Sequence, residues 1–460
     1  MPPRAGGKAL PWVAALALAV AVPVPAAAQG DSASPHATVL GWSDRTWLYA
    51  LDRGAVDGGR LNDLGWLMRF HPEIDDEQAI DEISVYPALG DDYAWRSREN
   101  GVRYWGGSIN HRDLIAGMEL KARVGLGRGW RVGFTFDLED RPGLDRNLPR
   151  FSVEKRWTPG IFAFGEGTLD ALKPEMDVTV GGGWRDGAGE VRGSLTVLDA
   201  FSDVIYQGLV VWAGFADTAL DYETRPYALR GTAHRRLGAR VRVELDVGAA
   251  LPSTVRAYRQ VAPDSGFRQD EQFGMAAGLV EWTVVKSVRA GALATWVRTV
   301  MDRTPLPLGR PADDFRLTER TTQVGGFLLA QISPRWRAES WLVREFRPQT
   351  KTYRTDTLPD VDYEDRAWRA QVLVRYLARF GLKAETALEV DRRDVVRGAG
   401  TVPSIDLTLG RHNARLRLEL GWRFGDRFWV DGGYRIDLDG DQGTDHGSFD
   451  GAHGRATLFW

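Results

Sequence analysis

From about residue 100 to the C-terminus, apolar and polar side chains alternate along segments that are commonly about 10 to 18 residues long. In "GWRVGFTFDLE", Trp130, Val132 and Phe134 fall on one face, whereas Arg131 and Thr135 fall on the other. This period of two is that of a β-strand, in which successive side chains point to opposite faces. Strands in soluble sheets usually have about 5–6 residues. The sequence therefore predicts an all-β protein with long strands.

Short and long connections alternate strictly between these predicted strands. Turns such as 127–129 and 425–427 are tight, whereas the connections predicted over 139–149, 200–224 and 261–268 are longer. A soluble sandwich has no reason for such alternation. In an outer-membrane barrel, the short turns face the periplasm, the long loops face outside, and the apolar face of each strand meets lipid. We therefore predict a transmembrane antiparallel up-and-down β-barrel.

The barrel is predicted to contain about 18 strands, with 16 as the alternative. Seventeen strands are predicted from residue 113 onward, and an even total requires one more, which the segment 102–110 supplies. The connection 200–224 is unusually apolar, so it forms either a constriction or oligomer contact or an extra strand or helix at the rim. The chain ends on "GRATLFW", and this last strand is expected to pair with the first and close the barrel.

Aromatic residues gather at the ends of the predicted strands, as in the two girdles that flank the apolar band of outer-membrane barrels. Most lie beside short turns or at the C-terminus, and two lie toward the long loops. The predicted girdle consists of Trp130, Trp157, Trp184, Trp296, Trp336, Trp368, Trp422, Phe428 and Trp460.

The N-terminus has the pattern of a secretory signal peptide over residues 1–28. Arg4 and Lys8 precede the apolar run "ALPWVAALALAVAV", and "AAAQG" offers a cleavage site after Ala28. A membrane anchor is the alternative, but prolines interrupt the apolar run and it is short for a span. The chain contains no Cys, which excludes a lipid-anchored cysteine and any disulfide. We therefore expect export from the cytoplasm.

The segment 29–98 is predicted to form short helices rather than barrel strands. Ser43 and Asn62 are candidate helix N-caps, and apolar side chains such as Trp47, Leu51 and Trp66 need burial. This segment either plugs the barrel or sits in the periplasm, and its sequence leaves both arrangements open. The barrel itself is predicted over residues 99–460.

The signal peptide, the alternating strands and the terminal strand "GRATLFW" together resemble the Gram-negative outer-membrane β-barrel superfamily, in a porin-like form. The resemblance covers residues 99–460. It implies a location in the outer membrane at the cell surface, contact with outer-membrane lipid and lipopolysaccharide, and recognition of the C-terminal strand by the barrel-assembly machinery. Capsule-assembly Wzi-type barrels are a more distant analogy, because "EKRWTPG" only faintly matches their tryptophan-rich motif.

The polar faces of the predicted strands carry charges of both signs, which would line the lumen. One interpretation is that cross-strand Arg–carboxylate pairs simply stabilise a wet wall. The other is that the charges form a transverse field that orients polar solutes. The predicted lumen-lining residues are Glu119, Lys121, Arg123, Arg131, Asp137, Arg242, Glu244, Asp246, Arg337, Arg369, Arg375, Lys383, Glu385, Glu389, Arg415, Arg417, Glu419, Asp431 and Arg435.

The sequence predicts no catalytic residues, no metal and no cofactor. It contains neither G-x-S-x-G nor H-E-x-x-H, and a scattered set of His111, His446, His453, Asp445 and Ser448 is only a weak candidate for catalysis. The acidic loop 437–451 suggests Ca²⁺, but it does not follow the EF-hand pattern. Removing residues 1–28 takes two positive charges from a net charge of -3, giving -5, so no nucleic-acid partner is expected.

The predicted function is a porin-like transport channel for small polar solutes. A barrel of about 18 strands is wide enough for an aqueous channel unless loops or another segment fill it. The alternative is a surface protein with a closed lumen that exports or attaches a polysaccharide such as capsule. The expected partner inside or at the mouth of the barrel is accordingly a small polar solute or a glycan.

Overall fold

The computed structural model describes residues 100–109, 113–141, 144–157, 160–170, 175–197, 200, 218–225, 227–309, 311, 314–355, 360–397, 410–438 and 449–460. The predictions for residues 1–28 and 29–98 lie outside these ranges. The described chain forms nineteen β-strands: β1 (Gly101–Ile109), β2 (Asp113–Gly127), β3 (Trp130–Arg141), β4 (Leu144–Arg156), β5 (Ile161–Asp170), β6 (Glu175–Arg185), β7 (Gly189–Val197), β8 (Thr218–Thr224), β9 (Tyr227–Leu237), β10 (Val241–Arg259), β11 (Ala262–Val285), β12 (Val288–Pro305), β13 (Phe315–Gln331), β14 (Trp336–Tyr353), β15 (Val361–Leu377), β16 (Leu382–Arg397), β17 (Gly410–Phe424), β18 (Phe428–Asp437) and β19 (Phe449–Phe459).

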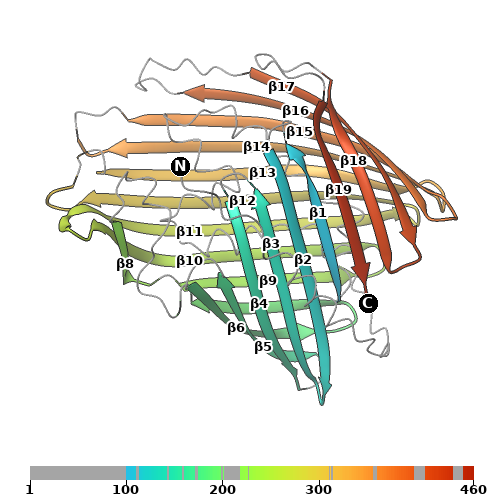
Figure 1. Ribbon diagram of the computed structural model, residues 1–460, viewed down its shortest axis with the longest axis horizontal. Helices are drawn as coiled ribbons and strands as arrows, with labels where there is room; N and C mark the ends of the chain where they lie inside the picture. The colour runs from blue at the N-terminus through green and yellow to red at the C-terminus, as the bar shows by residue number, and fades with distance from the viewer. Residues whose placement is uncertain are drawn as a thin grey trace, which may run out of the picture.

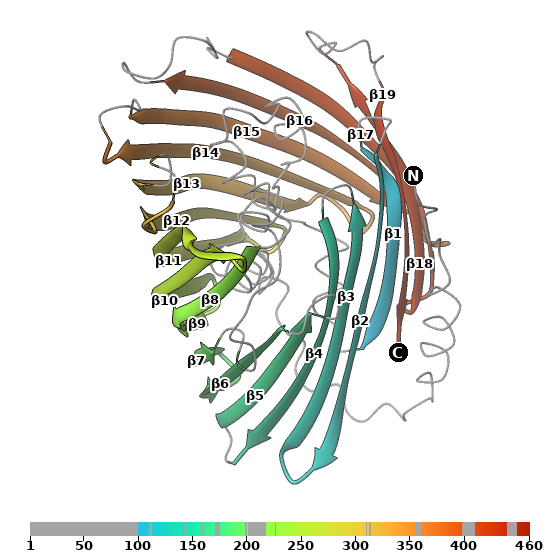
Figure 2. The same cartoon turned by 60° about the vertical axis from the view of Figure 1, so that its left-hand side comes forward.

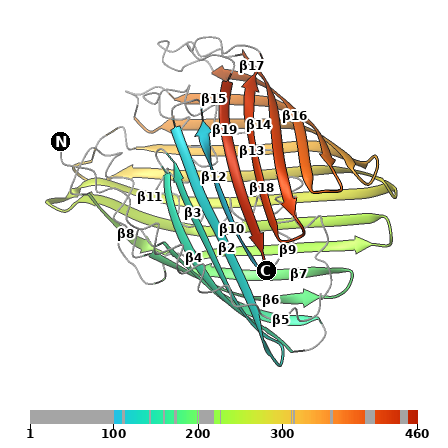
Figure 3. The ribbon, with the colours of Figure 1, turned by 45° about the vertical axis from the view of Figure 1, so that its right-hand side comes forward.

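The strands form one closed antiparallel sheet. Each strand pairs with its neighbours in the chain, except that β7 pairs with β9 and β8 pairs with β10. β1 pairs with both β2 and β19, which closes the sheet. The closing pair runs from Gly101 opposite Phe459 to Gly107 opposite His453. Figure 1 shows β1–β4, β18 and β19 crossing in front of β9–β16, and Figure 2 shows the two walls curving toward each other. Figure 3 brings the seam between the blue and red ends of the barrel forward. The predicted all-β barrel is confirmed.

The predicted count of about 18 strands is not confirmed, because the described residues form nineteen strand elements. The difference arises at β8 and β9, which pair with successive parts of the same long strand. β8 pairs with residues 254–259 of β10, and β9 pairs with residues 241–250. β8 also lies inside the connection predicted over 200–224, so residues 218–224 follow the alternative of an extra strand. β8 ends at Thr224 and β9 begins at Tyr227. The sequence between them contains Pro226, and proline has no N–H to donate to a ladder.

Burial along the strands is the reverse of that in a soluble sheet. On β10, the charged side chains of Arg242, Glu244 and Asp246 are only 2–5% exposed, whereas Leu245 and Val247 are 46% and 39% exposed. The side chains alternate as the sequence predicted, and the charged set faces the inside of the closed sheet. An apolar outer surface with a polar interior is the arrangement of a transmembrane β-barrel. Among the described residues, no helix has the length and hydropathy to cross a membrane.

Several predicted loops are shorter in the structure than in the sequence interpretation. The connection predicted over 261–268 is wrong, because β10 ends at Arg259 and β11 begins at Ala262. The connection predicted over 139–149 is likewise mostly strand, since β3 ends at Arg141 and β4 begins at Leu144. Polar residues there signalled a loop, but backbone pairing does not need apolar side chains, so strands continue beyond the apolar band.

The turn between β2 and β3 shows why a glycine-rich sequence makes a tight connection. Gly127, Arg128 and Gly129 have φ angles of 82°, 49° and 80°. This left-handed region is inexpensive for glycine and unfavourable for other residues. At Gly129, a Cβ would also lie 2.2 Å from the carbonyl oxygen of Arg156. The turn therefore needs glycine at that position for both conformation and space.

Candidate functional site

Eight inward-facing side chains on β15–β19 form a continuous set of polar contacts, which we call the charged network. Alternation places them on the inner face because the intervening residues, such as Leu388, Leu420 and Val430, are exposed on the outside. The network consists of Arg375, Lys383, Glu385, Arg417, Glu419, Asp431, His453 and Arg455.

Lys383 lies at the centre of the charged network and is fully buried. Its Nζ donates a hydrogen bond to Glu419 and another to Asp431 Oδ1 at 3.0 Å, and it lies 3.9 Å from Glu385 Oε2. These contacts join three adjacent strands, β16, β17 and β18. A buried ammonium group needs such partners, because an unpaired charge in a poorly solvated place is costly.

The arginines of the network complete the coordination of the same carboxylates. Arg375 donates from Nε to Glu385 Oε2 at 2.8 Å, and Arg417 Nη2 lies 3.2 Å from Glu385 Oε1. Arg455 on the last strand reaches Asp431 at 3.4 Å and Glu419 at 3.5 Å. Both ends of the network thus end in guanidinium groups, which bind carboxylates in a fixed fork geometry.

Of the weak candidates for catalysis, His453 is the one that lies among the described residues. It contacts Glu419, which was predicted to line the lumen. Its Nε2 lies 3.2 Å from Glu419 Oε2 inside the barrel. His111, His446, Asp445 and Ser448 lie outside the described residues, so the structure does not bring that set together. The acidic residues 439–448 also lie outside them. In the described part of the chain, no group of three or more His, Asp or Glu residues could hold a metal ion.

Other predicted lumen residues form separate ion pairs around the inner wall. Arg103 Nη2 bonds Glu119 at 2.7 Å across β1 and β2, and Arg242 Nε lies 2.6 Å from Glu244 on β10. Asp246 accepts two bonds from Arg230, at 3.0 and 2.6 Å.

The same pattern continues on β14, where Arg337 Nε lies 2.6 Å from Glu339. The remaining predicted residues divide into two groups. Lys121, Arg123, Arg131 and Arg415 lie on described strands, on the same face as the paired charges. The side chains of Asp137, Arg369, Glu389 and Arg435 lie outside the described part of the structure.

Several members of these pairs were not among the predicted site residues. Each nevertheless occupies a polar position of the alternation, so strict counting along the strand would have found it. Arg455 is the clearest case, since it lies between two outward residues of "GRATLFW", Gly454 and Ala456. The missed residues are Arg103, Arg230, Glu339 and Arg455. His453 was named only as a weak candidate for catalysis and not as a lumen residue.

The predicted girdle residues lie on the outer face. Trp296 and Trp368 occupy strand positions far from the short turns, whereas Trp130 and Trp336 begin strands directly after short turns. The nine side chains Trp130, Trp157, Trp184, Trp296, Trp336, Trp368, Trp422, Phe428 and Trp460 are all at least 36% exposed.

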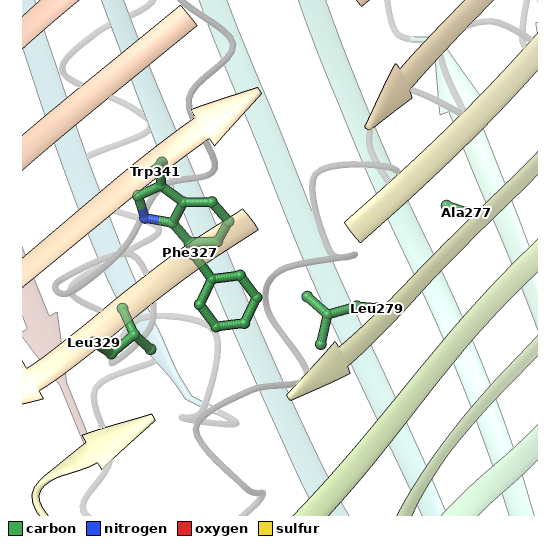
Figure 4. Close-up of a cluster of buried hydrophobic side chains, with 5 residues drawn as sticks. All are labelled: Ala277, Leu279, Phe327, Leu329 and Trp341. Carbon is green, nitrogen blue, oxygen red and sulfur yellow. The ribbon is translucent and has the colours of Figure 1, made fainter. Parts of the chain in front are cut away.

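An apolar cluster interrupts the charged inner wall on β11–β14, and it was not predicted. Phe327 and Trp341 stack with ring centroids 4.6 Å apart, and Leu279, Leu329 and Ala277 complete the cluster. Figure 4 shows Phe327 lying between Trp341 and Leu279. These residues share the inward parity of buried polar residues such as Glu339, so the cluster faces the interior. The inner wall therefore offers both charged and aromatic surfaces.

No family model and no curated protein matches the sequence. Solved structures similar to the chain are outer-membrane β-barrel proteins. They include a bacterial polysaccharide outer membrane secretin (8% identity, TM-score 0.37, covering 79% of this chain and 99% of that one). They also include the outer membrane channel DcaP of Acinetobacter baumannii (12%, 0.38, 78% and 96%) and OccK5 (OpdH) of Pseudomonas aeruginosa (9%, 0.39, 78% and 96%). The barrel is established by the strand pairing itself.

Proposed function

We propose that the chain is a non-enzymatic outer-membrane channel that lets small polar solutes pass through its lumen. The observation that carries this proposal is the inverted barrel wall, which has apolar residues on the outside and charged residues on the inside. The inner charges form ion pairs on the strands from β15 round to β2 and on β9–β14. A closed sheet of this many strands encloses a lumen wide enough for water. Each charge on such a wall is stabilised by its partner of opposite charge and by water in the lumen.

Polar atoms on the inner wall support a hydrated lumen. Glu339 Oε2, Thr321 Oγ1 and Trp341 Nε1 are buried and make no hydrogen bond to another described residue. Buried polar groups in folded proteins are almost always hydrogen-bonded, to protein or to ordered water. Water or a polar solute in the lumen would supply the missing partners. Mixed charges also favour solutes that are dipolar over solutes with one strong charge.

The proposed location follows from the same wall. The outward apolar band with aromatic residues at its two ends fits a lipid bilayer, and β-barrels of this kind are inserted into the outer membrane of Gram-negative bacteria. We propose that the C-terminal strand β19 is the segment read by the barrel-assembly machinery. Its pairing with β1 closes the sheet, and a barrel cannot be finished without it.

The direct test is conductance in a planar lipid bilayer. The folded full chain should give discrete open steps, and reversal potentials in a salt gradient should show weak ion selectivity because both signs of charge line the wall. The same measurement is made on a chain that lacks residues 29–98. If the truncated chain conducts and the full chain does not, the deleted segment closes the channel. Silence from both chains would contradict the channel.

A surface role with a closed lumen, in polysaccharide export or attachment, is the second candidate. The inward pair Phe327–Trp341 favours it, because flat aromatic faces pack well against the apolar faces of other rings. If both chains are silent in the bilayer, oligosaccharide binding measured by quenching of tryptophan fluorescence becomes the decisive assay. Loss of the signal in Trp341→Ala would then identify the binding wall.

A further inference from the structure

Five arginines lie at neighbouring outward-facing positions on the adjacent strands β12–β16, and β13 carries a further exposed arginine, Arg316, four residues nearer its start. They have the parity of exposed apolar residues such as Val324, Leu342 and Leu388, and the opposite parity to the buried polar residues of the same strands. We call them the outward arginines: Arg298, Arg320, Arg344, Arg366 and Arg392. An arginine on the lipid side of a barrel needs a reason, because charge at the middle of the apolar band is costly.

The position of these arginines along the barrel axis explains in part why charge is tolerated on the outer face. A tilted barrel strand advances about 2.5 Å per residue along the barrel axis, from a rise of about 3.3 Å and a tilt of about 40°. Arg298 follows the start of β12 at Val288 by ten residues, which places it about 25 Å above the short turn. The apolar band of such barrels is about 25 Å tall. Arg298 therefore lies at the boundary where hydrocarbon gives way to headgroups on the long-loop side.

A pocket between β12, β13 and β14 opens on this outer face. It has a volume of about 380 Å³ and is lined by Trp296, Arg298, Thr318, Arg320, Pro348 and Thr350. Arg298 and Arg320 lie directly opposite each other in the strand pairing. Neither forms an ion pair with a described residue, whereas the nearby Asp302 is already held by Arg354. Two adjacent like charges in one hollow are destabilising unless an anion joins them.

Arg344 shows how the protein holds a guanidinium group at this boundary. Its Cζ lies 4.5 Å from the ring centroid of Trp368 and 4.6 Å from that of Phe346. Such cation–π contacts are strongest where water is scarce, and they keep the arginine fork turned along the barrel surface. The aromatic and basic residues together form a surface that has an apolar lower part and a cationic upper part.

We propose that the pocket between Arg298 and Arg320 binds a phosphate group of an anionic membrane lipid in the outward-facing leaflet. Guanidinium groups bind phosphate oxygens through paired hydrogen bonds, and basic pockets on membrane proteins recognise lipid headgroups. A free phosphate ion shares this chemistry. The lipid is the better occupant because Trp296 lines the same pocket and the exposed apolar residues below it would contact acyl chains. This inference rests on the proposed membrane location and not on channel activity.

The test measures lipid binding to the folded full chain in detergent by native mass spectrometry. The probes are diphosphorylated lipid A, the same lipid with its phosphates removed, and inorganic phosphate. Wild type is compared with R298Q/R320Q, with T318F, which narrows the pocket and keeps both arginines, and with the control R335Q/R427Q. The control removes the same two charges from exposed residues in the short turns at the other end of the barrel. Flotation of each variant with lipid vesicles first establishes that the barrel inserts.

Wild type should retain diphosphorylated lipid A and release the dephosphorylated lipid. R298Q/R320Q should weaken retention at least tenfold, which corresponds to about 1.4 kcal/mol, T318F should also weaken it, and R335Q/R427Q should leave it unchanged. Equal binding by wild type and R298Q/R320Q, or equal weakening by the control, would overturn the site. Binding of inorganic phosphate as tight as that of the lipid would overturn the lipid assignment. A variant set that inserts normally and binds lipid, yet is silent in the bilayer, would count against the channel alone.

Discussion

Replacing Lys383 by methionine should destabilise the barrel by about 3 kcal/mol. Met keeps most of the volume of the side chain and removes only the charge. Lys383 is fully buried and donates to Glu419 and Asp431, and hydrogen bonds to charged groups are each worth about 1.5–3 kcal/mol. Their sum is about 3–6 kcal/mol, and the lower end applies because Arg455 still reaches both carboxylates.

The assay is reversible urea unfolding of the folded barrel in lipid vesicles, followed by tryptophan fluorescence. The control is K286M, because Lys286 lies in the exposed turn between β11 and β12 and carries the same side chain. Surface substitutions of that kind usually change the free energy of unfolding by less than about 0.5 kcal/mol. A difference of about 3 kcal/mol between the two variants would therefore report the environment of Lys383 and not the chemistry of the substitution.

A double variant separates charge balance from packing. In K383M/E419Q the ammonium group and one of its carboxylate partners are removed together, and Asp431 keeps Arg455 at 3.4 Å. The loss should then fall to about 1–2 kcal/mol, because the cost of a buried pair comes mainly from leaving one member alone. If K383M unfolds like K286M, Lys383 is not held by its buried ion pairs. If K383M/E419Q is no more stable than K383M, loss of volume and not of charge balance explains the effect.

Three further perturbations test other parts of the wall. Gly291→Ala should lower the free energy of unfolding, measured in urea, by about 1–3 kcal/mol. The new Cβ would lie 2.2 Å from Phe327 Cζ and 2.6 Å from the Val280 carbonyl oxygen. An unchanged urea midpoint would contradict this close packing. Asp246→Asn should leave the partly buried Arg230 without its carboxylate, costing about 3 kcal/mol and shifting the reversal potential of the channel toward anions. Unchanged selectivity would show that this pair does not face the conduction path. Deleting residues 449–460 should prevent assembly of a heat-modifiable barrel on cold gel electrophoresis, because β1 and β18 each lose one of their two partner strands and the sheet is left open. A folded, closed product would refute the role of the last strand in closure.

The sequence specifies the strands and their faces because both follow from a local period of two. Residues 241–247 illustrate this, since Arg242 and Glu244, which were predicted to line the lumen, are buried, whereas the adjacent Leu245 is 46% exposed on the outside. Closure could be expected from the terminal strand alone. Loops were less predictable, because a polar run such as 261–268 looks the same whether it pairs or turns. Residues 262 and 266–268 pair with the long strand β10, and residues 267–268 also pair with β12, which extends to Pro305.

The partners within the lumen could not be read from the sequence. Lys383 and Asp431 are 48 positions apart, and their contact depends on the register of two successive strand pairs. A shift of one residue in either pair would send one of these side chains to the lipid face. Alternation thus indicates which residues face inward, whereas register decides which of them meet.

The apolar cluster on β11–β14 shows where alternation fails and why this matters for transport. In "GGFLLAQ", Phe327, Leu328 and Leu329 are all apolar, so the period of two disappears and the face of each side chain is ambiguous. The structure places Phe327 and Leu329 inside and leaves Leu328 44% exposed outside. An inward aromatic surface beside Glu339 lowers the cost of passage for a solute that has one apolar face and several polar groups. A small inorganic ion gains nothing from that surface. We therefore expect Trp341→Ala to slow the permeation of such amphiphilic solutes while leaving the conductance of potassium chloride nearly unchanged.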